Sequence, residues 1–439
     1  MRMLALLSVL LASCAPNRPS IAIRGATLVD GSGGAAVPDS LVVVEGNRIT
    51  AAGPAATTSA AAGAQVVEAV GKFVIPGLMD LHVHLGSTGG PQFRAADYTR
   101  ERILQNLNAY LYLGVTTVRS VGTEREAGLA IRELQRAGTV ATSRLFTAGR
   151  GFTAPGGHPS QEIGDIARQP PNPEDARRQV RELAAQRVDL IKIWIDPRRG
   201  QAPKVSDPVV EAILAEAAQH KIPVHAHIHS LADTRHFLDH GGAGLLHMVR
   251  DTEVLPADFV ESLRSRKTAF VPTLVRQELA WLYREKPERL DDPDAAPLFG
   301  AATIAAMRES AGKSPQPPKI ARDEFDLAMR NSKRLADKGV VIAVGSDGGS
   351  QMDLPGLMTH RECELLVEAG FTPAQALVAA TANGARALAM GDIGTVAAGK
   401  LADLVLLDAD PLASVGNLRK IHRVMLDGKW VDRSGLLPP

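Results

Sequence analysis

The feature that most constrains this chain is a series of eight short apolar runs that alternate with longer stretches of helical periodicity. In the stretch at 208–219, for example, Val209, Val210 and Ile213 fall on one face of a helix. Apolar strands that alternate with amphipathic helices are typical of parallel sheets. Eight such units can close into a barrel whose active site lies at the C-terminal strand ends. We therefore predict an α/β fold in which residues 74–397 form a (β/α)8 TIM barrel. The eight runs lie at residues 73–85, 114–122, 143–150, 188–195, 223–229, 242–249, 268–274 and 340–347.

Both ends of the chain differ from this middle segment. Residues 21–73 and 398–439 contain short β-branched runs separated by turn residues, which predicts strands and tight connections. We expect the two segments to form one small β-sandwich domain. The longest connection between apolar runs, residues 275–339, follows the end of a predicted strand, so we expect it to form a lid or a wall of the active-site pocket.

The charge balance excludes one large class of function. The chain has 49 basic and 48 acidic residues, and aromatic residues make up only 4% of it. A protein without a basic excess or a base-stacking surface is not expected to bind nucleic acid, so we predict a small-molecule substrate. The sequence leaves open whether the chain forms a homo-oligomer. Its two cysteines, Cys14 and Cys363, lie far apart and indicate no disulfide framework.

Residues 1–20 are expected to act as an export signal and tether. One Arg precedes an apolar run of about ten residues, which is too short to span a bilayer and is typical of a secretory signal peptide. Residues 11–14, Leu-Ala-Ser-Cys, resemble the lipobox of bacterial lipoproteins. That resemblance implies export to the periplasmic side and a lipid anchor in the outer membrane through Cys14, and ordinary signal cleavage after Ala15 is the alternative.

Several apolar runs end in polar residues that the core of a barrel would not hold. His82 and His84 are two residues apart and so share one face of a strand, and Lys192 lies inside an apolar run. A single buried His is usually a hydrogen-bonded interior residue, but imidazoles, a lysine and a carboxylate gathered at one barrel mouth need a cation. The polar residues at these positions are His82, His84, Lys192, His225, His227, His229, His247 and Asp347.

Lys192 is the most unusual of these residues. A lysine among Ile and Trp side chains is costly as an ammonium ion unless it is paired or neutralised. Reaction with CO2 would turn it into a carbamate, an oxygen ligand that can bridge two metal ions. Imidazole and oxygen donors suit Zn²⁺, and Mn or Fe also fit such a set. From the residues alone, a carboxylated Lys192 could therefore join two divalent metal ions, with Zn²⁺ as the first choice.

Residues 74–84, Val-Ile-Pro-Gly-Leu-Met-Asp-Leu-His-Val-His, resemble the first-strand motif of the metal-dependent amidohydrolase superfamily. Lys192, the twenty-residue step from His227 to His247, and the Gly-Ser-Asp that ends at Asp347 fit the same family. The resemblance covers residues 21–433. It is strongest to the imidazolonepropionase-related subgroup, which includes metal-dependent Xaa-Pro and Xaa-Arg dipeptidases.

The resemblance implies a two-metal site with ligands at the strand ends. They are His82, His84 and Asp347 for the buried ion, His227 and His247 for the outer ion, and carboxylated Lys192 as the bridge. The family pattern Val-x-Ala-His selects His227 over His225, which faces the same way at a deeper level. We expect His225 either to support a ligand or to pack in the core.

Three further residues are candidate substrate contacts. His229 falls where relatives place a Tyr or His that touches the substrate, and a pocket-rim residue without that role is the alternative. His158 follows two glycines in a loop that resembles one common in the dipeptidase subgroup. Arg250, just past the sixth predicted strand, is a candidate for binding a substrate carboxylate, although the sequence position favours a solvated loop charge.

The expected reaction is metal-assisted hydrolysis of a C–N bond in a dipeptide, an N-acyl amino acid or a cyclic amide. A hydroxide shared by two cations would attack the carbonyl, and Asp347 would carry the proton to the leaving nitrogen. One alternative is a mononuclear deaminase or cyclic-amidine hydrolase of the same superfamily, which would generally lack the bridging lysine. An esterase or lactonase is a second alternative. A binding protein built on an inactive barrel is a third, and the complete ligand set argues against it.

Overall fold

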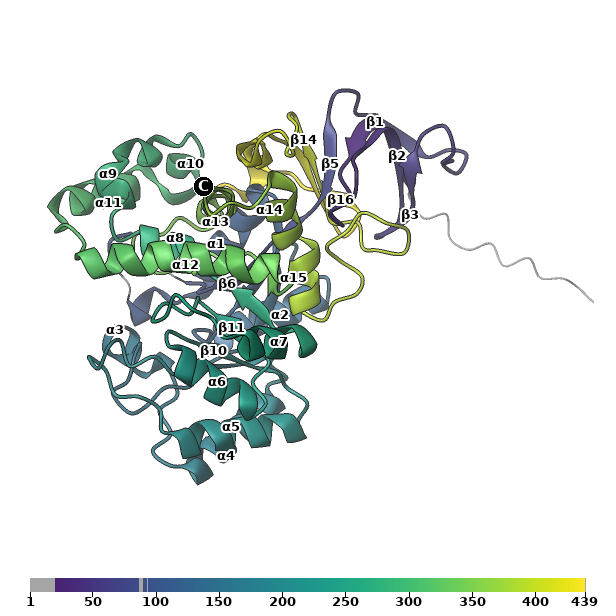
Figure 1. Ribbon diagram of the computed structural model, residues 1–439. Coiled ribbons are helices and arrows are strands. Elements are labelled where there is room, and N and C mark those ends of the chain that lie inside the picture. The colour runs from purple at the N-terminus through teal and green to yellow at the C-terminus, as the bar shows by residue number, and fades with distance from the viewer. Residues whose placement is uncertain (1–19, 87–89, 93, 439) are drawn as a thin grey trace, which may run out of the picture.

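The structure is a computed structural model, in which residues 20–86, 90–92 and 94–438 are described (Figure 1). The predicted signal peptide and Cys14 lie outside the described residues. Within the described part of the chain, no helix has both the length and the apolar character needed to cross a membrane.

Strands from both ends of the chain form one mixed sheet. Its order is β16-β15-β14-β5-β1-β2-β3, and β4 also pairs with β1. Side chains from distant strands, such as Ile23, Val42 and Leu404, are buried in one apolar cluster. Both ends thus contribute to one hydrogen-bonded sheet, and its folding into the two layers of a sandwich stays a prediction. The strands are β1 (Ser20–Leu28), β2 (Val37–Glu45), β3 (Arg48–Pro54), β4 (Gln65–Glu68), β5 (Phe73–Pro76), β14 (Leu404–Leu407), β15 (Ile421–Leu426) and β16 (Lys429–Trp430).

Eight parallel strands make up the middle of the molecule. They form a three-stranded sheet in the order β6-β7-β8 and a five-stranded sheet in the order β13-β12-β11-β10-β9. Each of the eight predicted apolar runs contains one of these strands. The strands are β6 (Leu78–Val83), β7 (Val115–Ser120), β8 (Arg144–Thr147), β9 (Ile191–Trp194), β10 (Val224–His227), β11 (Gly244–Leu246), β12 (Ala269–Val271) and β13 (Val341–Ile342).

Backbone hydrogen bonds connect the two parallel sheets at both of their outer edges. After β8, the Phe152 N–H donates to the Lys192 carbonyl, and the Trp194 N–H donates to the Phe152 carbonyl, both at 2.8 Å. At the other edge, the Leu81 N–H donates to the Val344 carbonyl at 2.9 Å. The C-terminal ends of the parallel strands therefore lie close together in space.

The first apolar run divides into two strands at Gly77. β5 joins the mixed sheet of the chain ends, whereas β6 begins the parallel strands. A Cβ atom at Gly77 would collide with the side chain of Thr116 on β7, so the close approach of this side chain to the backbone of residue 77 requires glycine. Residues 74–76, which we expected at the start of the barrel segment, therefore belong to the sheet of the chain ends instead.

Helices connect the parallel strands, as the sequence periodicity predicts. At α6 the side chain of Ser230 caps the helix by accepting from the Asp233 N–H, and Thr372 and Gln375 form a capping box at α14. The helices are α1 (Arg100–Tyr112), α2 (Glu126–Arg136), α3 (Ser160–Ile163), α4 (Pro173–Ala185), α5 (Asp207–Gln219), α6 (Leu231–Asp239), α7 (Ala257–Ser265), α8 (Leu274–Glu278), α9 (Leu282–Glu285), α10 (Ala295–Phe299), α11 (Ala301–Lys313), α12 (Lys319–Asp337), α13 (Leu357–Glu368), α14 (Pro373–Ala379) and α15 (Ala382–Ala387). Short 3-10 helices lie at Ala95–Asp97, Gly164–Ile166, Pro287–Asp291, Val415–Arg419 and Ser434–Leu436.

The long connection between β12 and β13 is helical and packs against itself. It runs through α8 to α12, and Trp281 meets Phe325 edge to face with 5.3 Å between the ring centroids. Arg276 on α8 and Glu324 on α12 line the pocket that also contains His84 and Asp347, so this connection forms a pocket wall, as predicted.

Candidate metal centre

His82, His84 and Asp347 meet at the end of β6. Nε2 of His82 lies 3.0 Å and Nε2 of His84 lies 2.9 Å from the same Asp347 carboxylate oxygen, Oδ1. All three residues are buried, and one donor atom from each lies within 4.8 Å of the other two. Two imidazoles and a carboxylate at this spacing could hold one metal ion.

The backbone holds Asp347 in an unusual conformation. Its φ of +60° lies in the left-handed region, and its N–H donates to the His82 carbonyl at 2.7 Å. His247 and Thr273 at neighbouring strand ends also have positive φ values, +69° and +52°. Non-glycine residues in this region store strain, which persists only where the surrounding structure enforces it and which is frequent at functional sites.

A second group of imidazoles adjoins the first. The His227 and His247 rings are 4.0 Å apart between centroids, and the His247 ring is 4.8 Å from that of His82. Nδ1 of His247 is 2.6 Å from the Thr273 hydroxyl, and Nε2 of His227 is 3.3 Å from an Asp196 carboxylate oxygen. These partners orient both rings at the edge of the pocket.

Lys192 lies fully buried beneath this group. Its Nζ has no hydrogen-bond partner among the described residues and stands 5.1 Å from the centroid of the Trp194 ring. Burial, assisted by the charge of Arg119, lowers the pKa of Lys192 to about 7 although Asp347 opposes the shift. A substantial fraction of the amine is therefore neutral near pH 7, which is the form that reacts with CO2.

The chemistry of the donor set fits metal ions. Nδ1 of His82 and Nζ of Lys192 are buried and have no hydrogen-bond partner within the described structure. Unpaired buried polar atoms are costly, so several of them at one place indicate a partner that the protein chain itself does not supply. Burial lowers the pKa of His82 to about 3, which keeps the imidazole neutral and able to bind a cation.

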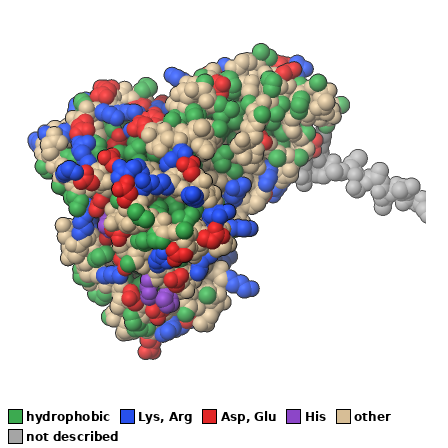
Figure 2. All heavy atoms as spheres, in the orientation of Figure 1, with side chains coloured by type: hydrophobic (Ala, Val, Ile, Leu, Met, Phe, Trp, Pro, Cys, Tyr) green, Lys and Arg blue, Asp and Glu red, His purple; other side chains and the backbone are tan. Residues whose placement is uncertain are grey.

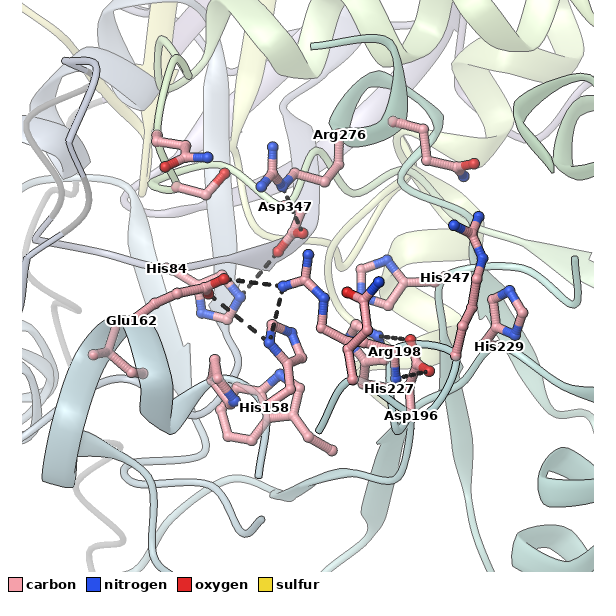
Figure 3. Close-up of a pocket in the computed structure, with 18 of the residues that line it drawn as sticks. His84, His158, Glu162, Asp196, Arg198, His227, His229, His247, Arg276 and Asp347 are labelled. Carbon is pink, nitrogen blue, oxygen red and sulfur yellow. Dashed lines mark hydrogen bonds and ion pairs between the residues drawn. The ribbon is translucent and has the colours of Figure 1, made fainter. Parts of the chain in front are cut away.

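A pocket of about 280 Å³ opens above these residues. The predicted substrate contacts His158, His229 and Arg250 all line it, together with Arg276 and Glu324. Figure 3 shows His158, His229 and Arg276 around this pocket. The predicted ligands that line it are His84, His227, His247 and Asp347, whereas His82 and Lys192 lie deeper. The residues predicted from strand-end positions are thus brought together at one site.

The comparisons with known proteins agree with this geometry. The model of the amidohydrolase family matches residues 73–431. The chain belongs to the amidohydrolase family. An imidazolonepropionase of Anaeromyxobacter dehalogenans is 28% identical to this amidohydrolase over 386 residues, covering 84% of each chain. A 5'-deoxyadenosine deaminase of Methanothermobacter thermautotrophicus is 24% identical, covering 89% of this chain and 85% of the relative. The solved structure of a Xaa-Pro dipeptidase superposes with a TM-score of 0.74 at 23% identity, covering 94% of this chain and 99% of that chain.

Membership of this family shows that the amidohydrolase is a hydrolase of C–N bonds. Its candidate substrate contacts are fixed by charged neighbours. Nε2 of His229 is 3.1 Å from a Glu324 carboxylate oxygen, and Nδ1 of His158 is 3.2 Å from the Arg198 guanidinium. Arg198 in turn donates to Glu162 at 2.9 Å, so one wall of the pocket is held by a chain of polar contacts (Figure 3).

Arg250 is a pocket residue and not a solvated loop charge. No carboxylate among the described residues lies within 4.0 Å of its guanidinium, and its Nε is buried without a hydrogen-bond partner. Burial lowers the pKa of Arg250 from its usual value, although Asp196 and Glu324 oppose the shift from a distance. The group stays charged at neutral pH and is available to an anionic ligand.

His225 and Asp80 support the site from below. Burial, with the charge of Arg119 next, lowers the pKa of His225 well below its usual value, and its ring packs closely against the backbone of Gly244. Asp80 accepts hydrogen bonds from the hydroxyls of Ser346 and Thr359 at 2.6 and 2.7 Å. Asp80 therefore ties β6 to the segment that carries Asp347.

Several residues of the pocket were not predicted from the sequence, among them Asp196, Arg198, Arg276 and Glu324. Asp196 lies two residues beyond the end of β9. The search for polar residues at the ends of predicted strands, which found the candidate ligands, could therefore have found it. Arg198 follows in the same loop. Arg276 and Glu324 come from the long helical connection, where their side chains look like ordinary residues of a polar helix face, and no sequence signal marks them.

Proposed function

We propose that this amidohydrolase uses two divalent metal ions to hydrolyse an amide bond in a small substrate that carries a carboxylate, such as a dipeptide or an N-acyl amino acid. One observation carries the proposal. Imidazoles from three strands, the buried Lys192 and the Asp347 carboxylate converge beneath a pocket whose wall contains Arg250 without an acidic partner among the described residues.

We also propose that the eight parallel strands form one closed (β/α)8 barrel and that the mixed sheet packs as a β-sandwich. The hydrogen bonds at both outer edges of the parallel sheets support the first part, because a closed barrel leaves no strand edge unpaired. The positions of the candidate ligands, at the C-terminal ends of the strands, agree with the place where such barrels carry their active sites.

The proposed metals would be held by buried imidazole and oxygen donors, for which Zn²⁺ is the first choice. The ligands would be His82, His84 and Asp347 for the inner ion, His227 and His247 for the outer ion, and Lys192, after reaction with CO2, for both. Such ions would polarise the substrate carbonyl and lower the pKa of a water molecule. Thr273 and Asp196 would keep His247 and His227 in their orientations.

The placement of Asp347 supports a role in moving the proton. Burial alone would raise its pKa, but His82 and His84 hold the pKa well below its usual range, so the carboxylate is ionised and can accept a proton. Its second oxygen, Oδ2, lies 3.6 Å from Nε of Arg276 on the pocket side. We propose that Asp347 accepts a proton from the attacking water and donates it to the leaving nitrogen.

The proposed role of Arg250 predicts a specific change in substrate binding. In an Arg250→Gln variant we expect KM for substrates with a free carboxylate to rise by about 10- to 100-fold with little change in kcat, because a charge-assisted hydrogen bond is lost. For analogues in which an amide replaces the carboxylate, KM should be the same in the variant and in the wild type. The measurement is a screen of the metal-loaded enzyme against dipeptides, N-acyl amino acids and their C-terminal amides.

An Arg308→Gln variant is the matched control, because Arg308, which lies on α11, forms an exposed ion pair with Asp291. A metal-loaded enzyme that cleaves the acids and the amides equally well, with and without Arg250, would refute the carboxylate assignment. An enzyme that hydrolyses no amide in either library would refute the proposed substrate class as a whole.

The main alternative is a one-metal deaminase or cyclic-amidine hydrolase of the same family, and the deaminase relative gives it weight. The buried amine of Lys192 at the ligand cluster argues against it, because a mononuclear site has no use for a bridging group. An esterase or lactonase is a further candidate, because the same metal pair would attack C–O bonds; ester substrates in the library test it.

We further propose that the protein is exported and anchored to the outer membrane through a lipid on Cys14. The lipobox-like residues 11–14 support this. A Cys14→Ala variant should lose the lipid and leave the membrane fraction, as followed by fractionation and by mass spectrometry of the mature N-terminus. A wild-type protein that begins after Ala15 and carries no lipid would contradict the anchor.

A further inference from the structure

A second group of metal-binding side chains lies on the outer surface, away from the pocket. It consists of Glu211 on α5 and of His236 and His240 at the end of α6, and Asp207, one turn before Glu211, adjoins it next to His236. Each pair is four residues apart, so its two side chains lie on the same helix face. Figure 2 shows histidine side chains next to acidic ones over this part of the molecule, and these residues are not among those that line the pocket.

The distances in this group are close to those of a metal site. Nε2 of His236 lies 3.7 Å and Nε2 of His240 lies 3.6 Å from the same carboxylate oxygen of Glu211. Asp207 approaches Nε2 of His236 to 3.8 Å. Ligand atoms around a tetrahedral Zn²⁺ with bonds near 2.1 Å are about 3.4 Å apart, so only small side-chain movements are needed.

Both imidazoles direct a suitable nitrogen toward the acidic pair. Nδ1 of His240 is 2.8 Å from the His236 carbonyl oxygen, to which it donates, so that Nε2 carries the lone pair. Nε2 of His236 is buried and has no hydrogen-bond partner within the described structure, although acidic oxygens lie nearby. A cation between the four groups would satisfy this nitrogen and neutralise the carboxylates.

We propose that Asp207, Glu211, His236 and His240 bind a transition-metal ion such as Zn²⁺, which links α5 to α6. This site is separate from the catalytic centre. Its ion would stabilise the region that carries two candidate ligands, because α5 follows the strand of Lys192 and α6 follows the strand of His227. The loop between β9 and α5 also carries Asp196 and Arg198, so the link restrains one wall of the pocket.

The test uses the enzyme with its catalytic metals already bound. Zn²⁺ is then titrated into the wild type, into a His236→Ala/His240→Ala double variant and into a His220→Ala control. His220 caps the C-terminal end of α5 and pairs with Glu216, outside the proposed site. We expect the wild type and the control to bind one additional ion per chain and to gain at least about 2 °C in Tm at saturating Zn²⁺. The double variant should gain neither.

Retention on a nickel-charged iminodiacetate resin gives a second readout that does not depend on activity. The untagged wild type and the control should be retained, and the double variant should elute early. Equal zinc binding by the wild type and the double variant would overturn the proposal. So would an equal loss of zinc binding and of resin retention in the double variant and in His220→Ala. Unchanged catalytic metal content in the double variant verifies that the substitutions leave the rest of the fold intact.

Discussion

An Asp347→Asn variant should lose activity by about 10²- to 10⁴-fold in kcat, the loss typical of removing a general acid–base group. Asn has nearly the same shape and keeps an oxygen that can face His82 and His84, whose Nε2 atoms lie 3.0 and 2.9 Å from Oδ1. It lacks a basic carboxylate, so it cannot accept the proton that the attacking water releases. The fold and most of the bound metal should persist, and both are measured beside kcat.

The control for this variant is Asp392→Asn, because Asp392 forms a partly exposed ion pair with Arg48 far from the pocket. It should retain wild-type turnover. An Asp347→Asn enzyme that binds both metals and keeps near-wild-type kcat would show that the proton-transfer role is wrong. Another group at the pocket, such as His229, would then have to carry the proton.

A Lys192→Ala variant should lose most of its bound metal together with its activity. The substitution would remove the oxygens that bridge the two metal ions. Changes to residues that only hydrogen-bond to a metal ligand already lower metal affinity or activity by about 10- to 100-fold. The loss of a ligand itself should therefore lower both by more than this. The fold should survive, because the substitution removes a buried amine that has no hydrogen-bond partner in the described structure. Metal content, kcat/KM and Tm are the measurements.

Short-chain carboxylic acids provide a more specific test of the same role. A carboxylate that enters the space left by the Lys192 side chain could occupy the bridging position, and partial recovery of metal and activity is expected. A Lys313→Ala variant, which removes an exposed ion pair with Glu309 on α11, is the control. Its metal content and activity should not change when short-chain carboxylic acids are added. A Lys192→Ala enzyme with full metal content and full activity would exclude the bridging role.

The order of elements could be predicted from the sequence because each buried strand needs an apolar run and each covering helix needs an apolar face. The candidate ligands could be predicted because the C-terminal ends of parallel strands lie at the same edge of the sheet. This holds for any conformation of the segments that connect the strands. His82 and His84 also follow the two-residue period of a strand, which places both imidazoles on one side of β6.

Other features could not be predicted because the physical cause lies in tertiary contacts. The division of residues 73–85 into β5 and β6 depends on the close approach of Gly77 to Thr116, and the apolar run itself shows no break. The pairing of β14 with β5 joins distant segments, and periodicity does not specify strand partners. Glu324 reaches the pocket only because α12 lies across it, so its role depends on the packing of the whole connection.

The most direct test of the two-metal centre is elemental analysis of the protein after reconstitution with Zn²⁺ and bicarbonate. It is best carried out in the His236→Ala/His240→Ala background, so that zinc on the outer surface does not enter the count. We predict two metal ions per chain in that background and a loss of most of them when Lys192→Ala is added. At most one metal ion per chain in a fully active enzyme would contradict the two-metal centre.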